Sequence, residues 1–117
     1  MSEKCCHEHN IKGRMEAIPR QEDFGIAGDV FKMLGDATRV RLFWLLCHCE
    51  SCVCNLSDTM GMSSPAVSHH LKLLKTAGLV ITRREGKEVL YKAADTQLAQ
   101  ALHKMIEEVL QIACPVV

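Results

Sequence analysis

Four cysteines lie within eight residues near the middle of the chain, at Cys47, Cys49, Cys52 and Cys54. Closely spaced thiolates are ligands for soft metal ions, and thiols of low pKa also react with oxidants. The whole chain has 7 cysteines, an odd number that cannot pair completely within one molecule. The cluster therefore predicts metal ligation or redox sensing, and argues against a disulfide framework.

The composition is that of an ordinary globular protein with one domain. The 117 residues are 48% hydrophobic and 24% charged, which allows a single modest core. No run of 18 apolar residues occurs, and the first residues lack the apolar stretch of a signal peptide. We therefore expect a cytoplasmic protein with no membrane contact, in a compartment where thiols stay reduced.

The net charge is zero, but the positive charge is concentrated in one segment. Residues 63–92 contain six Lys or Arg and two acidic residues, whereas residues 1–30 contain four basic and six acidic residues. The segment 63–92 is therefore where contacts with phosphates are expected.

Hydrophobic periodicity predicts five helices and one β-hairpin. Asp36 is a candidate cap for the second helix, Asp95 or Thr96 for the last, and Gly86 suits the hairpin tip. The first 22 residues lack a helical stripe and are expected to form a flexible arm. The expected helices are 24–34, 37–46, a short one from 51 or 52 to 60, 65–77 and 98–113, and the expected strands are 79–84 and 89–93.

The third and fourth helices, joined by a tight turn, have the helix-turn-helix pattern. We expect Ser64 to cap the fourth helix and Pro65 to occupy its first position. The outer side of that helix then carries small or hydrogen-bonding groups suited to base edges and phosphates: Ser68, His69, Lys72 and Lys75. With the basic hairpin as a two-stranded wing, the sequence predicts a mainly α, winged helix-turn-helix fold that binds DNA.

Several segments, in this order, resemble the ArsR/SmtB family of metal-responsive winged-helix repressors. They are residues 35–41, 52–56, 66–75, 77–80 and 84–87, followed by Tyr91. The resemblance covers roughly residues 24–113. It implies a homodimer paired through the first and last helices of a domain over residues 23–114, which binds operator double-stranded DNA and is released by an effector. It also implies that the protein has no enzymatic activity.

The resemblance extends to the residues that contact DNA. Ser64, Ser68 and His69 align with the family's groove-facing positions, and His70 and Lys72 lie beside them. Lys75 extends the same basic side of the helix. Arg83, Arg84 and Lys87 belong to the wing.

Cys52 and Cys54 match the metal-binding motif of the family's third helix. Residues two apart on a regular helix point about 200° away from each other, so these two thiols can share an ion only at the first turn or before it. The positive end of the helix dipole lowers thiol pKa there. In the cadmium and lead branch, cysteines of the N-terminal arm complete the site, usually from the other subunit. Cys5 and Cys6 are the matching residues, with His7 and His9 in reserve.

Other residues depart from the family patterns. The arsenic branch has a third cysteine where this chain has Ser57, and Cys49 could replace it. Cys47 resembles a cysteine near the end of the second helix in some cadmium-type members and is a possible ligand, although an apolar filler of the core is the favoured interpretation. A second family site between the two last helices needs histidines that are missing here. Its positions hold Asp95, Gln97, Glu108 and Gln111.

His103 lies out of register with that second site, so it is interpreted as a surface or packing residue. The role of Cys114 stays open.

The expected effector is cadmium, lead or zinc bound by thiolates, with trivalent arsenic or antimony as the nearest alternative. A thiol-redox or persulfide switch is a hypothesis of another class. A third is a constitutive DNA binder or partner-binding module with a structural zinc site, in which chelation would unfold the domain.

Overall fold

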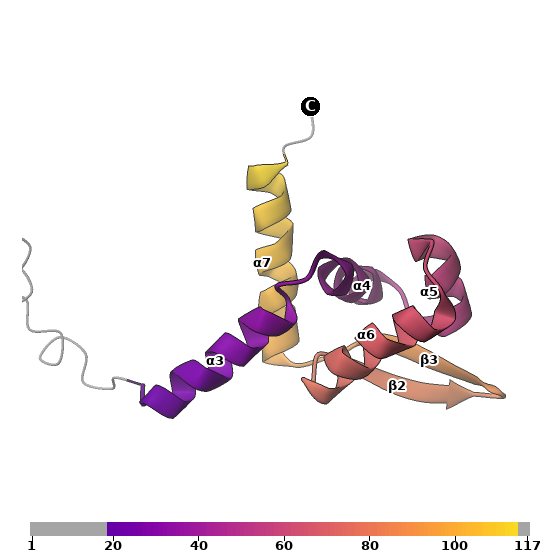
Figure 1. Ribbon diagram of the computed structural model, residues 1–117, viewed down its shortest axis with the longest axis horizontal. Coiled ribbons are helices and arrows are strands. Elements are labelled where there is room, and N and C mark those ends of the chain that lie inside the picture. The colour runs from indigo at the N-terminus through magenta and orange to yellow at the C-terminus, as the bar shows by residue number, and fades with distance from the viewer. Residues whose placement is uncertain (1–18, 115–117) are drawn as a thin grey trace, which may run out of the picture.

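The computed structural model describes residues 19–114 of the chain (Figure 1). Over these residues the chain forms five helices and three short strands. In chain order they are α3 (Gln21–Met33), α4 (Ala37–His48), β1 (Ser51–Cys52), α5 (Val53–Met60), α6 (Ser64–Thr76), β2 (Val80–Glu85), β3 (Glu88–Ala93) and α7 (Gln97–Ala113). The predicted mainly helical fold with a β-hairpin wing is confirmed.

The strand β1 is a difference from the prediction. Its two residues pair with β3, Ser51 with Tyr91 and Cys52 with Leu90, so the sheet has three strands in the order β1-β3-β2. A strand of two residues has no hydrophobic alternation, and only its pairing partner reveals it. The segment that carries Cys52 is thereby hydrogen-bonded to the wing.

Capping side chains fix where the helices begin. The Asp36 carboxylate accepts the backbone N–H of Arg39 at 3.0 Å, and the Thr96 hydroxyl accepts that of Ala99 at 3.1 Å, as predicted. The cap of α6 differs from the prediction, because Ser63 and not Ser64 has this role. The Ser63 carbonyl accepts the N–H of Val67 at 3.0 Å, so the first intrahelical bond starts one residue earlier.

The core forms around α4, whose apolar side packs against α6 and α7. Leu79 and Val80 at the start of the hairpin, and Ala94 just after β3, complete the core. Its largest fully buried side chains are Leu42, Phe43, Val67, Leu71, Leu74, Leu79 and Val80. Because α6 is held by three of these residues on one side, its opposite side must face solvent.

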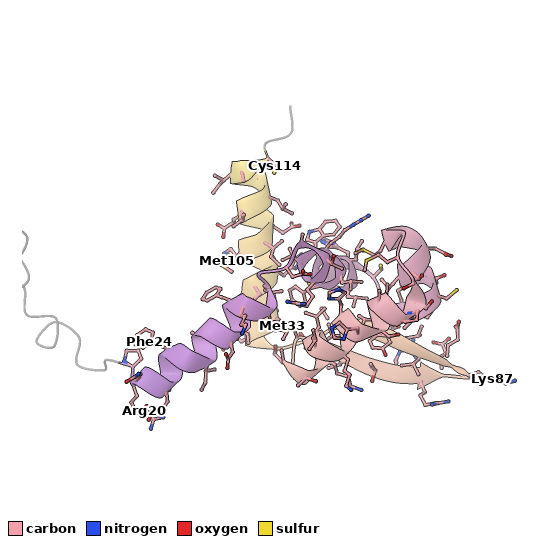
Figure 2. The ribbon with its side chains drawn as sticks, in the orientation of Figure 1. Arg20, Phe24, Met33, Lys87, Met105 and Cys114 are labelled. Carbon is pink, nitrogen blue, oxygen red and sulfur yellow. The ribbon has the colours of Figure 1, made fainter. Side chains whose placement is uncertain are left out.

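Two helices keep apolar surface exposed. No residue of α3 is buried, and Phe24 at its start is 61% exposed. On α7, Val109 and Ile112 are exposed as well. Both helices project from the body that contains α4, α5 and α6 (Figure 1), and Figure 2 shows Phe24 and Met105 on them. Within residues 19–114, no helix is long and apolar enough to cross a membrane.

The turn between α5 and α6 depends on one glycine. Gly61 ends α5 with φ 65°, a left-handed conformation. We expect Gly61→Ala to lower the free energy of unfolding by about 1–2 kcal/mol, because a Cβ is strained at this φ. Gly61→Asn should cost less, since asparagine tolerates the conformation. Urea unfolding at one fixed protein concentration checks this, and an equal loss for both variants would contradict it.

Candidate functional site

A stripe of polar residues runs along the exposed surface of α6, next to the side that Val67, Leu71 and Leu74 bury. Ser64, Ser68 and Lys72 follow one another at four-residue intervals, so their side chains lie along one side of the helix. All three are exposed, as is His69 beside them. This stripe presents hydroxyl, imidazole and ammonium groups to solvent, a set that can contact base edges and phosphates.

His70 has a different environment from its neighbours on α6. Its side chain is only 18% exposed, and its Nδ1 lies 3.4 Å from the Arg39 Nη1 and 4.0 Å from the Asp36 carboxylate. The Arg39 Nε in turn donates to the Met33 carbonyl at 2.7 Å. His70 thus connects α6 to the start of α4 and to the end of α3, which fits a residue that positions the helix.

The basic residues of the wing fall into two groups. The Arg83 guanidinium donates to both carboxylate oxygens of Glu50, at 2.7 and 2.8 Å, and to Glu85 at 2.8 Å. This bonding holds the pKa of the Glu50 carboxyl below its usual range. Arg84 and Lys87 are exposed and have no ion pair within the described part of the chain. Figure 2 shows Lys87 at the far tip of the wing.

One face of the hairpin is turned toward α6. The Lys75 ammonium donates to the Thr82 hydroxyl at 3.2 Å, and Arg84, two residues further along β2, shares the face of Thr82. Lys75 thus bridges α6 and the wing. The positive groups of α6 and the wing without such a partner are Lys72, Arg84, Lys87 and Lys92, as far as the described residues go.

Cys52 and Cys54 lie at the first turn of α5, which is where helix geometry would allow the two thiols to share an ion. Cys52 is the N-cap residue, with extended backbone, and Cys54 is the second residue of the helix. Their environments differ: Cys52 is 8% exposed and Cys54 is exposed. Cys5 and Cys6, with His7 and His9, lie outside the described residues. The Cys52 thiol is thus shielded by the core, whereas the Cys54 thiol is open to solvent.

Cys52 is also part of the wing sheet. Leu90 of β3 pairs with Cys52 on one side and with Arg83 on the other. Directly paired residues carry their side chains on the same face of a sheet, so the three form one row across it. Glu50, two residues before Cys52, is joined to this row through its ion pair with Arg83. A displacement of Cys52 thus acts directly on the wing.

The two other cysteines of the cluster lie at the end of α4. Cys47 is half-buried against the core, and burial together with the nearby Glu107 raises the pKa of its thiol to about 11. Such a thiol is protonated at neutral pH. Cys49 follows the last turn of α4, is exposed, and donates to the Leu45 carbonyl at 3.5 Å.

Ser57, which stands where a third cysteine would complete the arsenic pattern, is used to hold the turn. Its hydroxyl donates to the Met62 carbonyl, beyond the end of α5. The end of α5 is therefore tied to the residue just before the cap of α6.

A group of potential ligands that the sequence reasoning missed lies between α4 and α7. Among residues 19–114, one set of three His, Cys, Asp or Glu side chains is close enough to share an ion, namely His48, His103 and Glu107. From the sequence, His103 is expected to be a surface or packing residue, and no role is predicted for His48. The available signal was two pairs at i,i+4 spacing, Trp44 with His48 and His103 with Glu107. That these pairs face each other depends on how α4 packs against α7.

Comparisons with known proteins find bacterial transcriptional regulators similar to this chain. The family described as "Bacterial regulatory protein, arsR family" matches residues 36–82. The chain is 35% identical over 99 residues to the cadmium resistance transcriptional regulatory protein CadC homolog of Staphylococcus aureus, covering 84% of this chain and 81% of the relative. It is 38% identical over 84 residues to the arsenic resistance transcriptional regulator ArsR2 of Pseudomonas putida, covering 71% and 72%.

Solved structures have the same fold. A homodimeric winged helix-turn-helix DNA-binding domain from Mycobacterium bovis superimposes with a TM-score of 0.67 at 26% identity. The match covers 85% of this chain and 90% of that one.

The thiols should differ in their reactivity toward iodoacetamide. In the folded protein with chelator at neutral pH, we expect Cys49 and Cys54 to be alkylated at least about tenfold faster than Cys47 and Cys52, because the latter two are shielded by the core. Peptide mass spectrometry over time measures the four rates. In guanidinium chloride the rates should converge, and equal rates in the folded protein would contradict the burial described above.

Proposed function

The chain belongs to the arsR family of bacterial transcriptional regulators, which are not enzymes, and we propose that it is an operator-binding repressor released by a soft metal ion. The observation that carries the proposal is the polar stripe of Ser64, Ser68 and Lys72 on the exposed surface of α6, next to the buried side of that helix. The hydroxyls and the imidazole of His69 would read base edges. Lys72, Arg84 and Lys87 would neutralise phosphates on either side.

We infer that two copies pair through α3 and α7. The supporting observation is that both helices expose several large apolar side chains, which mark an interaction surface when they gather on one face of a protein. The similar domain from Mycobacterium bovis is homodimeric. Pairing by twofold symmetry would double the phosphate contacts and fix the distance between two recognition helices, which is what an inverted repeat requires.

We further propose Cys52 and Cys54 as the sensing thiolates, completed by Cys5 and Cys6 of the N-terminal arm. An all-thiolate donor set suits cadmium, lead or zinc, which supply no chemistry beyond coordination. Trivalent arsenic is the alternative to these ions, since relatives at similar identity are named for cadmium and for arsenic resistance.

The proposed signal passes from Cys52 to the DNA-binding surface by two routes. Ligation by Cys52 competes with its burial, so the ion would pull on β1 and on the first turn of α5. The first route runs along α5 and through the Ser57–Met62 hydrogen bond to the cap of α6. The second runs across the sheet row through Leu90 to Arg83. Both would change the orientation of the recognition helix relative to the wing.

The DNA-contact assignment can be tested with a DNA fragment selected by the wild-type protein from random sequences. We expect Ser68→Ala combined with His69→Ala to weaken binding by about 1–3 kcal/mol per lost base contact, at least tenfold overall, in gel-shift assays. Lys104→Ala, which alters an exposed residue of α7, is the control and should bind normally. Unchanged binding by the double variant, with the dimer intact, would refute the assignment.

The sensing assignment can be tested by titrating the reduced wild-type protein with cadmium and with arsenite. We expect thiolate-to-metal absorption in the near ultraviolet at close to stoichiometric cadmium, together with loss of operator affinity. Cys52→Ser, and Cys5→Ser combined with Cys6→Ser, should lose both responses, whereas Cys49→Ser should keep them.

The alternatives give different results in the same titration. Dependence on Cys49 with a stronger response to arsenite would favour the arsenic site. Release by oxidant with no metal response would overturn metal sensing in favour of a redox switch. Unfolding upon chelation would indicate a structural zinc site.

A further inference from the structure

We propose that His48, His103 and Glu107 form a second metal site, for a zinc-class divalent ion on nitrogen and oxygen ligands, which joins α4 to α7 within one protomer. This site shares no residue with the proposed thiolate site. It also differs from the family site sought at Asp95, Gln97, Glu108 and Gln111, whose positions hold no histidine.

The distances between the ligand atoms suit a shared ion. The Nε2 atoms of His48 and His103 lie 3.2 Å apart. Two imidazole nitrogens bound to one zinc ion at about 2.0–2.1 Å, at the tetrahedral angle, are separated by about 3.3–3.4 Å. The Glu107 Oε2 lies 3.7 Å from the first nitrogen and 3.8 Å from the second. A shift of the carboxylate by a few tenths of an ångström therefore completes three corners of a tetrahedron.

Trp44 orients two of the three ligands. Its indole Nε1 donates to the Glu107 Oε2 at 2.6 Å, a bond that lowers the pKa of this carboxyl and keeps it ionised. Its ring packs against the His48 imidazole with centroids 4.4 Å apart. The hydrogen bond to a ligating carboxylate is the kind of outer contact that fixes ligand geometry in metal centres.

The cluster is open to solvent on one side. The side chains of His48, His103 and Glu107 are 45%, 30% and 48% exposed, so an ion can enter without unfolding. His48 and His103 also line a cavity of about 360 Å³ whose other walls include Cys47, Cys49 and Asp95. This space has room for a water molecule as the fourth ligand, which the three-ligand set requires.

The softest ions distinguish the two proposed sites. Two histidines and a carboxylate suit zinc and cobalt(II), while the soft cadmium and lead ions favour thiolates. A zinc-class ion here would fasten α7 to α4, and hence the proposed dimer helix to the core helix. Its binding should therefore raise the thermal stability of the protomer.

The test is a cobalt(II) titration of the full reduced chain, read by absorption. Cobalt on nitrogen and oxygen ligands gives visible d–d bands without the near-ultraviolet charge-transfer band that thiolate ligation adds. We expect His103→Gln and Glu107→Gln to bind one fewer cobalt ion per protomer, or to bind it at least tenfold more weakly, while the charge-transfer band remains. Glu108→Gln, which alters an exposed carboxylate of α7 outside the cluster, is the matched control and should bind cobalt(II) as the wild type does.

The wild-type protein provides a measurement that does not depend on variants. Zinc should shift the ring nitrogen resonances of His48 and His103 in nuclear magnetic resonance spectra and leave those of His69 unchanged. The proposal is overturned if these rings do not respond, or if the variants keep the wild-type stoichiometry and d–d bands. If the wild-type protein shows the d–d bands but no charge-transfer band, the thiolate site is contradicted and the His48, His103 and Glu107 site is not. The two proposals therefore fail separately.

Discussion

The packing of α6 against α4 is the contact on which the rest of the structure depends. Leu71 and Leu74 of α6 are fully buried, in the same core cluster as Leu42 and Phe43 of α4. Each such side chain contributes about 1.5–3 kcal/mol by leaving water. This burial fixes the rotation of α6 about its own axis, and the rotation decides which residues reach solvent. The polar stripe is therefore a consequence of the core, and it cannot turn away without losing that core.

Cys52 is part of both the strand β1 and the start of α5, and this shared position suits the switch role proposed for it. It is the cap position of α5 and one of the two residues of β1, so both the helix-turn-helix and the wing depend on where it sits. An exposed thiol such as Cys54 could bind an ion with little effect on the fold. A thiol that must leave a buried position couples ligation to a conformational change, because binding free energy can shift an equilibrium only through a difference between the two states.

Long periodic elements could be predicted from the sequence, whereas contacts between elements could not. The helices around Val67 and Leu102 follow from apolar spacing, and the caps at Asp36 and Thr96 follow from residue type. The strand β1 escaped prediction because two residues carry no period. The contact of His48 with His103 joins residues that are 55 positions apart in the sequence. It depends on how α4 packs against α7, which no local pattern encodes. Arg83 is a predicted DNA-contact residue whose guanidinium is bound to Glu50 in the structure. This ion pair could not be predicted for the same reason, because its two residues are 33 positions apart in the sequence.

Trp44 has a consequence for how this molecule can be observed. It is the single tryptophan of the chain, and it lies at the junction of α4 and α7 with its indole N–H on a carboxylate and its ring against an imidazole. Indole emission depends on the polarity and charge around the ring, and a nearby protonated imidazole quenches it. The protein thus carries an intrinsic optical reporter at the point where its core helix meets its last helix, so the state of that junction can be followed without any added label.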